Sequence, residues 1–180
     1  MRYNYIRYYY SNFIKIEEVG GSFFRPAFFD YPNDPLSYVD VENNIFLGSA
    51  LKASILVNTT DELKPGQTSN FYFPPGLYCQ IYPPADTKTA DYCFESLADN
   101  KDGTQVETRY KKLRTQLEDY YIHLRSGSVL PYQEAEIKKV QDTKQLADLP
   151  IDLYVLPHNK PQPVVMNAAG YIYLDDGIHH

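Results

Sequence analysis

Residues 20–34 read GGSFFRPAFFDYPND, and this stretch decides how the N-terminal part of the chain is interpreted. The glycine pair at 20–21 is typical of a helix end, because glycine adopts the left-handed backbone conformation that closes a helix. The almost continuous apolar run at 22–31 predicts a short buried strand. Pro26 lacks a backbone N–H, so it indicates an irregular point or a strand start. A helix, a glycine turn and a buried strand in this order are typical of an α/β-barrel unit.

The segments on either side of this stretch predict one helix followed by many strands. Before it, apolar residues three and four positions apart, among them Ile6, Tyr10 and Phe13, predict a helix over residues 2–19. After it, the PNDP sequence at 32–35 breaks the chain. Apolar or alternating runs then predict strands, with a glycine bend at 48 and a polar loop over 83–104, at 45–47, 50–57, 71–73, 77–82, 120–125, 129–131, 151–156 and 171–174. The chain is therefore expected to be mainly β.

Composition excludes several classes of protein. Hydrophobic residues make up 43% of the 180 residues, which is enough to bury a core. The net charge is −6, and lysine and arginine form no long run, so no nucleic-acid-binding surface is expected. No apolar stretch approaches the roughly 20 residues that span a bilayer, and the polar N-terminus has no signal-peptide core. The 18 tyrosines suit half-buried strands and carbohydrate-facing surfaces alike.

Cys79 and Cys93 are the two cysteines of the chain. A zinc site needs about four ligands, and no close histidine pair completes one here, so no metal site is predicted. The alternatives are a disulfide and two free buried thiols. The loop-rich, proline-rich surroundings favour the disulfide, which would require an oxidising compartment. Asn58 begins an Asn-Thr-Thr glycosylation sequence, which matters only in a secretory setting.

Six segments resemble, in the same order, sequences of glycoside hydrolase family 31, the α-glucosidase family. The helix that starts at Arg2 resembles the family's Arg-Tyr…Pro-Tyr-x-Tyr helix, although Arg7 stands where the family usually has proline. Residues 21–34 are very similar to the family's Arg-Pro-Leu-Phe-x-Glu-Phe-Pro-x-Asp strand. The remaining four resemblances lie at Phe46–Leu51, Tyr72–Tyr78, His123–Gln133 and Gly170–Gly177. Each motif alone is weak, but six in register over nearly the whole chain are specific.

This resemblance implies a mainly β fold in three parts. Residues 1–42 would be the last helix and strand of a (β/α)8 catalytic barrel, residues 43–134 a proximal β-sandwich, and residues 135–180 the truncated start of a distal β-sandwich. The resemblance also implies an enzyme that, at full length, hydrolyses terminal α-linked glucose from α-glucosides or oligosaccharides without a cofactor. Such enzymes belong to the secretory, lysosomal or extracellular space.

The chain itself is not expected to be catalytic. Retaining glycosidases need two carboxyl groups roughly 5 Å apart. In family 31 both are aspartates on strands before the helix that opens this chain, so the resemblance assigns no catalytic residue here. Phe29 and Asp30 are candidates for the pocket rim, because barrel active sites form at the C-terminal ends of strands. A simpler interpretation of Asp30 is an acid that pairs with a nearby donor or faces solvent.

Other polar residues are more simply structural than chemical. The Asp175-Asp176 pair suits local hydrogen bonding in a turn. His123 and Arg125 lie two apart on one strand face, where they could bind an anion or form structural hydrogen bonds. The terminal His179-His180 pair is expected to be mobile.

Two main hypotheses follow for the function. In the first, the chain is part of an α-glucosidase-type hydrolase whose catalytic half lies upstream. In the second, it is a non-catalytic β-sandwich subunit or interaction module derived from that family. One barrel helix and one strand cannot close a barrel, so residues 2–31 need the missing barrel half or another chain to cover them. A third hypothesis is a carbohydrate-binding surface of exposed tyrosines.

Overall fold

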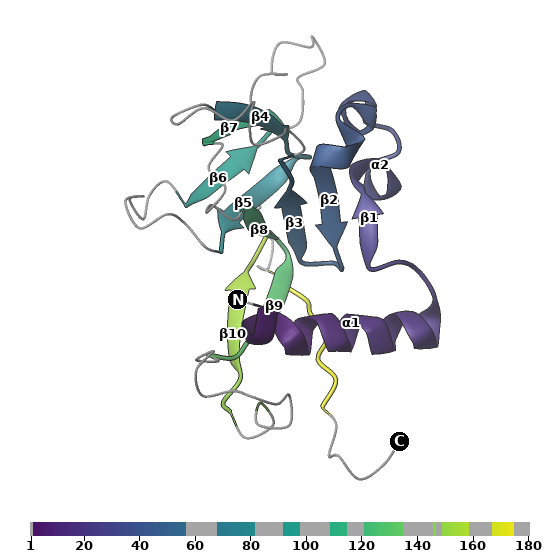
Figure 1. Cartoon of the computed structure of the whole chain (residues 1–180), viewed down its shortest axis with the longest axis vertical. Helices are drawn as coiled ribbons and strands as arrows, with labels where there is room; N and C mark the ends of the chain where they lie inside the picture. The colour runs from purple at the N-terminus through teal and green to yellow at the C-terminus, as the bar shows by residue number, and fades with distance from the viewer. Residues whose placement is uncertain are drawn as a thin grey trace.

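The computed structural model describes residues 2–56, 68–81, 92–97, 109–114, 121–134, 146, 149–158 and 167–174. The helical segments are η1 (Arg2–Tyr5), α1 (Ile6–Val19), α2 (Ala27–Asp30), η2 (Pro35–Tyr38) and η3 (Val41–Asn43). The strands are β1 (Phe24–Pro26), β2 (Asn44–Leu47), β3 (Leu51–Ser54), β4 (Thr68–Tyr72), β5 (Gly76–Gln80), β6 (Cys93–Ser96), β7 (Tyr110–Arg114), β8 (Ile122–Arg125), β9 (Ser128–Tyr132) and β10 (Asp152–Leu156). Figure 1 shows α1 lying across one end of these strands.

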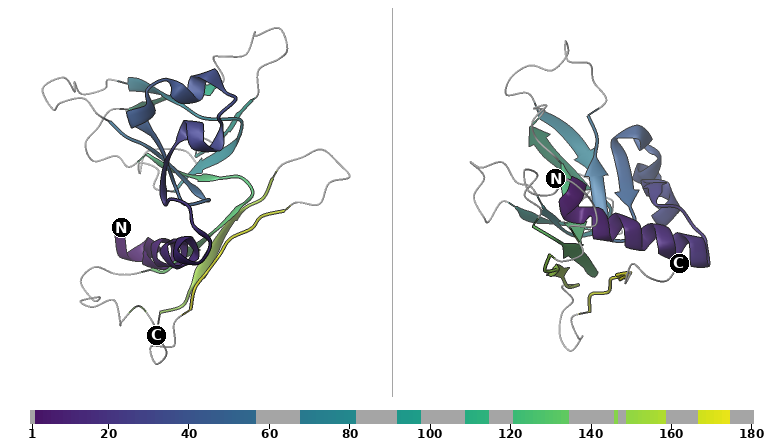
Figure 2. Two further views of the ribbon diagram at one scale, coloured as in Figure 1. Left: turned by 90° about the vertical axis from the view of Figure 1, so that its right-hand side faces the viewer. Right: turned by 60° about the horizontal axis from the view of Figure 1, so that its bottom comes forward.

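The strands join into antiparallel sheets. The main sheet has the order β1-β2-β3-β8-β5-β6, and β4 with β7 and β9 with β10 form two-stranded sheets. Figure 2 shows β9, β10 and the C-terminal segment 167–174 side by side, directed away from the main sheet. The prediction of a mainly β fold is confirmed.

A second layer lies against the main sheet. Phe71 of β4 and Leu113 of β7 share a core cluster with Tyr78 of β5 and Tyr121, and Phe94 of β6 packs against that cluster. The β4–β7 pair therefore buries one of its faces against the β5–β6 side of the main sheet, as antiparallel strands with one apolar face do.

Helix α1 forms where the sequence predicts it and packs beneath the strands. Gly20 ends it: its φ is 80°, and its N–H donates to the Ile16 carbonyl oxygen at 2.8 Å. Tyr5 and Tyr8 share a core cluster with Phe23, Ala50 and the strand residues Leu51, Leu124 and Leu130. No helix in the described part of the chain is long and apolar enough to cross a bilayer.

Residues 22–31 differ from the predicted single buried strand. Only Phe24–Pro26 is extended, at the edge of the main sheet beside β2, and Ala27–Asp30 turns into the short helix α2. Pro26 is the physical reason, because it has no N–H for a ladder and its φ of −64° suits the residue that enters a helix. Phe24 is 62% exposed. The prediction of a buried strand here is therefore wrong, and the apolar run faces outward in part.

Two further segments depart from their predictions. Residues 83–104 were expected to form a polar loop, but Cys93–Ser96 within them is strand β6, which pairs with β5. Residues 171–174 alternate like a strand, yet they form none. Instead, the Tyr173 N–H donates to the Ser11 hydroxyl at 2.8 Å, so this segment lies on α1 and joins no ladder there.

The turn between β2 and β3 requires glycine. Gly48 has a φ of +59°, and a Cβ there would lie 2.5 Å from both the Tyr8 hydroxyl and the Asn12 side-chain oxygen. The absence of a side chain at Gly48 lets Tyr8 approach the turn. The Tyr8 hydroxyl donates to the Leu47 carbonyl at 2.6 Å and accepts from the Ala50 N–H at 2.9 Å. Burial raises the pKa of Tyr8 to about 12, so the phenol stays protonated and can make both bonds. Helix α1 is thereby fixed to the sheet.

Cys79 of β5 and Cys93 of β6 are direct cross-strand partners and form a disulfide. The bond closes a loop with a sequence separation of 14. Reduction is expected to lower the free energy of unfolding by about 3 kcal/mol, because it releases chain entropy to the unfolded state. Urea denaturation with and without a phosphine reductant measures the difference. The Cys79→Ser/Cys93→Ser double variant is the control, since the reductant should not affect it; a loss below about 1 kcal/mol in the unmodified chain would contradict the prediction.

Candidate functional site at the junction of helices and sheet

Asp30, the last residue of α2, joins two arginines from different strands. Its Oδ1 accepts from Arg25 Nε at 3.0 Å, and its Oδ2 accepts from Arg25 Nη2 at 3.1 Å. Arg125 Nη1 lies 3.5 Å from the same Oδ2. The Arg125 guanidinium also lies over the rings of Tyr31 and Phe46, at 5.3 Å and 5.5 Å from their centroids. The cluster therefore connects α2, β1 and β8.

This geometry makes Asp30 an anchor for cations. Both carboxylate oxygens accept N–H bonds, and the paired contact with Arg25 is the bidentate arrangement that gives directional, charge-assisted hydrogen bonds. Such a carboxylate positions arginines and does not present a free oxygen to a substrate. Arg25 and Asp30 belong to the 21–34 motif and Arg125 to the 123–133 motif. Two of the resembling segments thus meet at one ion cluster.

Asp34 forms a second polar cluster next to the first. Its Oδ1 accepts from the Leu36 N–H at 3.0 Å and caps η2. Its Oδ2 accepts from the Tyr72 hydroxyl at 2.5 Å and from Arg109 Nη1. Burial, followed by the hydrogen bond to Asp34, raises the pKa of Tyr72, so its phenol remains a donor. The cluster ties the loop after α2 to β4 and to the start of β7.

A cavity of about 480 Å³ lies beside these clusters. Residues 30–35 form one side of it, and Pro75 and Arg109 complete the lining. Asp30 thus borders an open space. Phe29 does not line this cavity. It is 61% exposed and contacts the Phe28 ring at 5.2 Å between centroids.

A buried polar network lies inside the main sheet. Lys52 of β3 is fully buried; its Nζ donates to Asn44 Oδ1 at 2.9 Å and Ser54 Oγ at 2.7 Å, and lies 4.0 Å from the Phe73 ring centroid. Its cross-strand partner is His123 of β8. Burial lowers the pKa of Lys52 well below its ordinary value. Burial and then the nearby Lys52 charge lower the pKa of His123 to about 3.

The predicted pair of His123 and Arg125 does not form one site. His123 is buried among Lys52 and aromatic rings, whereas Arg125 is part of the Asp30 cluster. Within the described residues, no group of three or more His, Cys, Asp or Glu side chains is arranged to hold a metal ion. The glycosylation candidate Asn58, the Asp175-Asp176 pair and the His179-His180 pair lie outside the described residues.

Sequence reasoning missed two residues of these clusters. Lys52 lies in the apolar run ALKASIL at 50–56, where its burial follows from its partners rather than from its own chemistry. Arg109 begins a charged stretch with no motif, and its partner Asp34 is 75 positions away. The one available signal for Lys52 was its position in the middle of an otherwise apolar strand.

The described tyrosines form no single platform for sugar. Core clusters contain Tyr5, Tyr8, Tyr72, Tyr78 and Tyr121. The three most exposed large tyrosine side chains, Tyr10, Tyr38 and Tyr154, lie on α1, η2 and β10 respectively. Since these are three different elements, the described surface favours the interpretation of tyrosine as a half-buried packing residue.

Comparisons with known proteins point to one group of enzymes. No protein-family model matches the chain. The chain is 28% identical to an α-glucosidase of Hordeum vulgare, in an alignment that covers 98% of this chain and 17% of the relative. It therefore spans about a sixth of the length of the curated relatives that it matches.

Solved structures agree at the level of the fold. The glucosidase II α subunit, in a structure described as Glc1Man2-bound, superposes with a TM-score of 0.68 at 19% identity, over 98% of this chain and 16% of that chain. A GH31 dextranase of Flavobacterium johnsoniae complexed with glucose superposes with a TM-score of 0.60 at 16% identity, over 88% of this chain and 16% of that chain.

Proposed function

Because this chain is a relative of the glycoside hydrolase family 31 α-glucosidases and matches their C-terminal region, we propose that it is the C-terminal segment of such a hydrolase, one that removes terminal α-linked glucose. The observation that carries the proposal is the alignment of 98% of this chain with 17% of an α-glucosidase. Hydrolysis requires a pair of carboxyl groups. We place that pair on the upstream part of the enzyme, outside this chain.

The proposed layout has three parts. Residues 1–42 would be the end of the catalytic barrel, residues 43–134 a proximal β-sandwich, and residues 135–180 the start of a distal β-sandwich. The two layers made by the main sheet and the β4–β7 pair support the second assignment. The pairing of β1 with β2 crosses the first boundary, so the segment that precedes it would be held to the sandwich by backbone hydrogen bonds.

Exposed apolar side chains support the proposal that another part of the enzyme covers the N-terminal part of this chain. Among the described side chains of residues 4–40, seven large hydrophobic ones are exposed, namely Tyr10, Phe13, Val19, Phe24, Phe29, Tyr38 and Val39. Exposed apolar side chains that form a contiguous patch mark a surface that another part of a protein covers. In the proposed enzyme, the upstream barrel half covers it, and Phe29 with Asp30 borders the substrate pocket.

The β9–β10 sheet supports a continuation at the other end. Leu153, Tyr154 and Val155 of β10 are all exposed, although successive side chains of a strand point to opposite faces. A two-stranded sheet is marginally stable alone and gains stability from further strands or a covering layer. Both exposed faces are therefore consistent with a distal β-sandwich to which β10 belongs.

The disulfide indicates the kind of compartment in which the proposed enzyme works. A cross-strand bond between Cys79 and Cys93 persists in an oxidising environment. We therefore place the enzyme in the secretory, lysosomal or extracellular space, where α-glucosides or oligosaccharides would be its substrates.

The intact mass of the polypeptide in its native source tests the proposal. If 17% of a relative corresponds to this 20.8 kDa chain, the natural enzyme should be roughly sixfold heavier. The purified polypeptide should also release nitrophenol from p-nitrophenyl α-D-glucoside, whereas the isolated 180-residue chain should not. A native mass near 20.8 kDa would overturn the proposal. It would favour a non-catalytic subunit, and a binding partner that covers residues 2–31 should then co-purify.

A further inference from the structure

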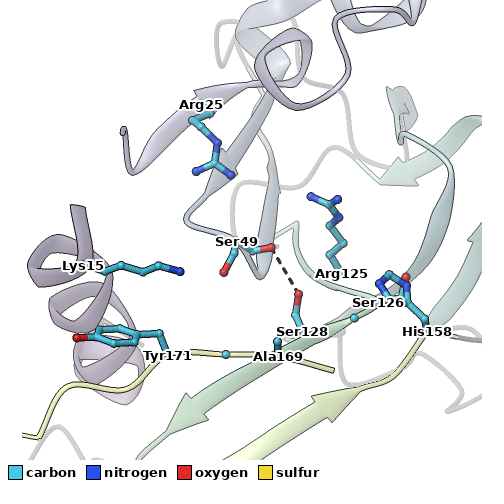
Figure 3. Close-up of a pocket in the computed structure, with 11 residues that line it drawn as sticks. Lys15, Arg25, Ser49, Arg125, Ser126, Ser128, His158, Ala169 and Tyr171 are labelled. Carbon is cyan, nitrogen blue, oxygen red and sulfur yellow. Dashed lines mark hydrogen bonds between the residues drawn. The ribbon is translucent and has the colours of Figure 1, made fainter. Parts of the chain in front are cut away.

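A cavity of about 320 Å³ lies where α1, the β2–β3 turn, the β8–β9 turn and the segment 167–174 meet. Figure 3 shows Lys15 reaching toward it from α1, Arg25 from β1 and Arg125 from β8, with Ser49 of the β2–β3 turn among them. Three elements, of which β8 is about a hundred positions from the other two, thus direct cationic side chains toward one space.

The lining carries an excess of positive charge. Lys15, Arg25 and Arg125 are cations, and the two arginines share the carboxylate of Asp30. Lys15 Nζ lies 5.8 Å from the centroid of the Tyr171 ring, a contact that leaves its charge uncancelled. Like charges around one cavity repel each other unless an anion enters it.

Neutral hydrogen-bonding groups complete the walls. Ser126 and Ser128 line the cavity although they are only 7% and 4% exposed. The Ser128 hydroxyl makes a long contact of 3.5 Å with the Ser49 carbonyl oxygen, so it can turn to a better acceptor. His158 closes another side: a Cβ at Gly127 would lie 2.1 Å from its Nε2, so only glycine admits the imidazole there.

The floor of the cavity is held in place by backbone bonds. The Ala169 N–H donates to the Gly127 carbonyl at 2.9 Å, and the Val129 N–H donates to the Ala169 carbonyl at 3.1 Å. The Tyr173 N–H donates to the Ser11 hydroxyl at 2.8 Å. The segment 167–174 is thus fixed to both β9 and α1, and the cationic side chains face a defined surface.

We propose that this cavity binds an oxyanion of the phosphate or sulfate type, free or as part of a small molecule such as a sugar phosphate. Lys15 and Arg125 would supply charge-assisted donors, and the Ser49 and Ser128 hydroxyls neutral ones. A volume of 320 Å³ corresponds to about ten water molecules, which leaves space for a group attached to the anion. The bound anion would clamp α1, the main sheet and the C-terminal segment together. This inference does not depend on the hydrolase activity.

Calorimetric titration of the purified polypeptide tests the site. Sodium phosphate, sodium sulfate and glucose 6-phosphate are titrated at low ionic strength, with sodium chloride as the reference. We expect phosphate and sulfate to bind, and Lys15→Gln to weaken their binding about tenfold, because it removes one charged donor and keeps a polar, uncharged side chain. Lys112→Gln on the exposed face of β7 is the matched control and should leave the affinity unchanged. Tighter binding of glucose 6-phosphate than of phosphate would identify a sugar phosphate as the source of the anion.

Three results would overturn the inference. The first is the absence of heat with every oxyanion. The second is equal binding by the Lys15→Gln and Lys112→Gln variants. The third is binding by the isolated chain that is lost in the longer native polypeptide, which would mean that another part of the protein fills the cavity. Hydrolysis of a neutral glucoside is assayed separately, so failure here leaves the proposed function untouched.

Discussion

Replacement of Asp34 by alanine is expected to lower the free energy of unfolding by about 3–5 kcal/mol. The carboxylate accepts hydrogen bonds from Arg109, Tyr72 and the Leu36 N–H. The Arg109 side chain is only 8% exposed, so Asp34→Ala takes a charged acceptor away from a largely buried guanidinium, and breaking one half of such a pair is costly. Urea denaturation followed by circular dichroism measures the loss.

Two further variants separate the ion pair from general damage. Glu42→Ala, at an exposed position of η3, removes one carboxylate from the same region and should change stability by less than about 0.5 kcal/mol. Arg109→Met should cost less stability in the Asp34→Ala background than in the unmodified chain, because the pair is already broken there. A loss below about 1 kcal/mol for Asp34→Ala, or additive losses in the double variant, would show that the pair is not coupled.

Local sequence patterns predict best those helices and strands whose ends are marked by glycine. Gly20 closes α1, Gly48 separates β2 from β3, and the Ser-Gly-Ser turn at 126–128 separates β8 from β9. In each case glycine has a positive φ that other residues rarely adopt, so the boundary is visible in the sequence. The prediction of a buried strand over residues 22–31 is wrong for a different reason. The apolar content of this run predicts burial, although part of the run faces outward.

The polar clusters were less predictable than the strands. Asp30 was singled out as an acid with a nearby donor, and Arg25 is five positions away, within reach of local reasoning. Arg125 is 95 positions from Asp30, so its contribution depends on how the sheet is assembled. The same holds for strand β6: only its pairing with β5 distinguishes it from loop sequence. Contacts across the fold cannot be read from the spacing of residues along the chain.

The polar clusters give a physical account of the resembling motifs. Asp30 of the 21–34 segment binds Arg25 of the same segment and Arg125 of the 123–133 segment, and Asp34 binds Tyr72 of the 72–78 segment. Gly48 of the 46–51 segment admits Tyr8 of the opening helix. These residues join the helices to the sheet, so motifs of this kind are signatures of a structural junction. A junction of this kind would preserve the fold even where the overall sequence identity is low.

The free energy of unfolding is expected to fall by about 2 kcal/mol when the pH is lowered from 6.5 to 5, because of His123. Its pKa is lowered from 6.5 to about 3 in the folded chain, first by burial and then by the charge of Lys52; Lys111 adds to this, and a backbone hydrogen bond with Tyr121 opposes it. Between these two values the unfolded chain binds a proton that the folded chain does not. Stability is therefore complete above pH 6.5 and is lost progressively as the pH falls toward 3, by about 5 kcal/mol in all.

Urea denaturation at pH 7, 6, 5 and 4 measures this dependence. The His123→Gln variant is the control, since glutamine keeps a polar side chain and does not titrate; the other three histidines remain in both proteins. The difference in slope between the two chains then belongs to His123. A direct measurement on the unmodified chain is the NMR shift of the His123 ring proton, which should stay constant down to about pH 4. Equal slopes in both chains, or a ring that titrates near 6.5, would mean that protons and water reach His123, and that the Lys52 network is open to solvent.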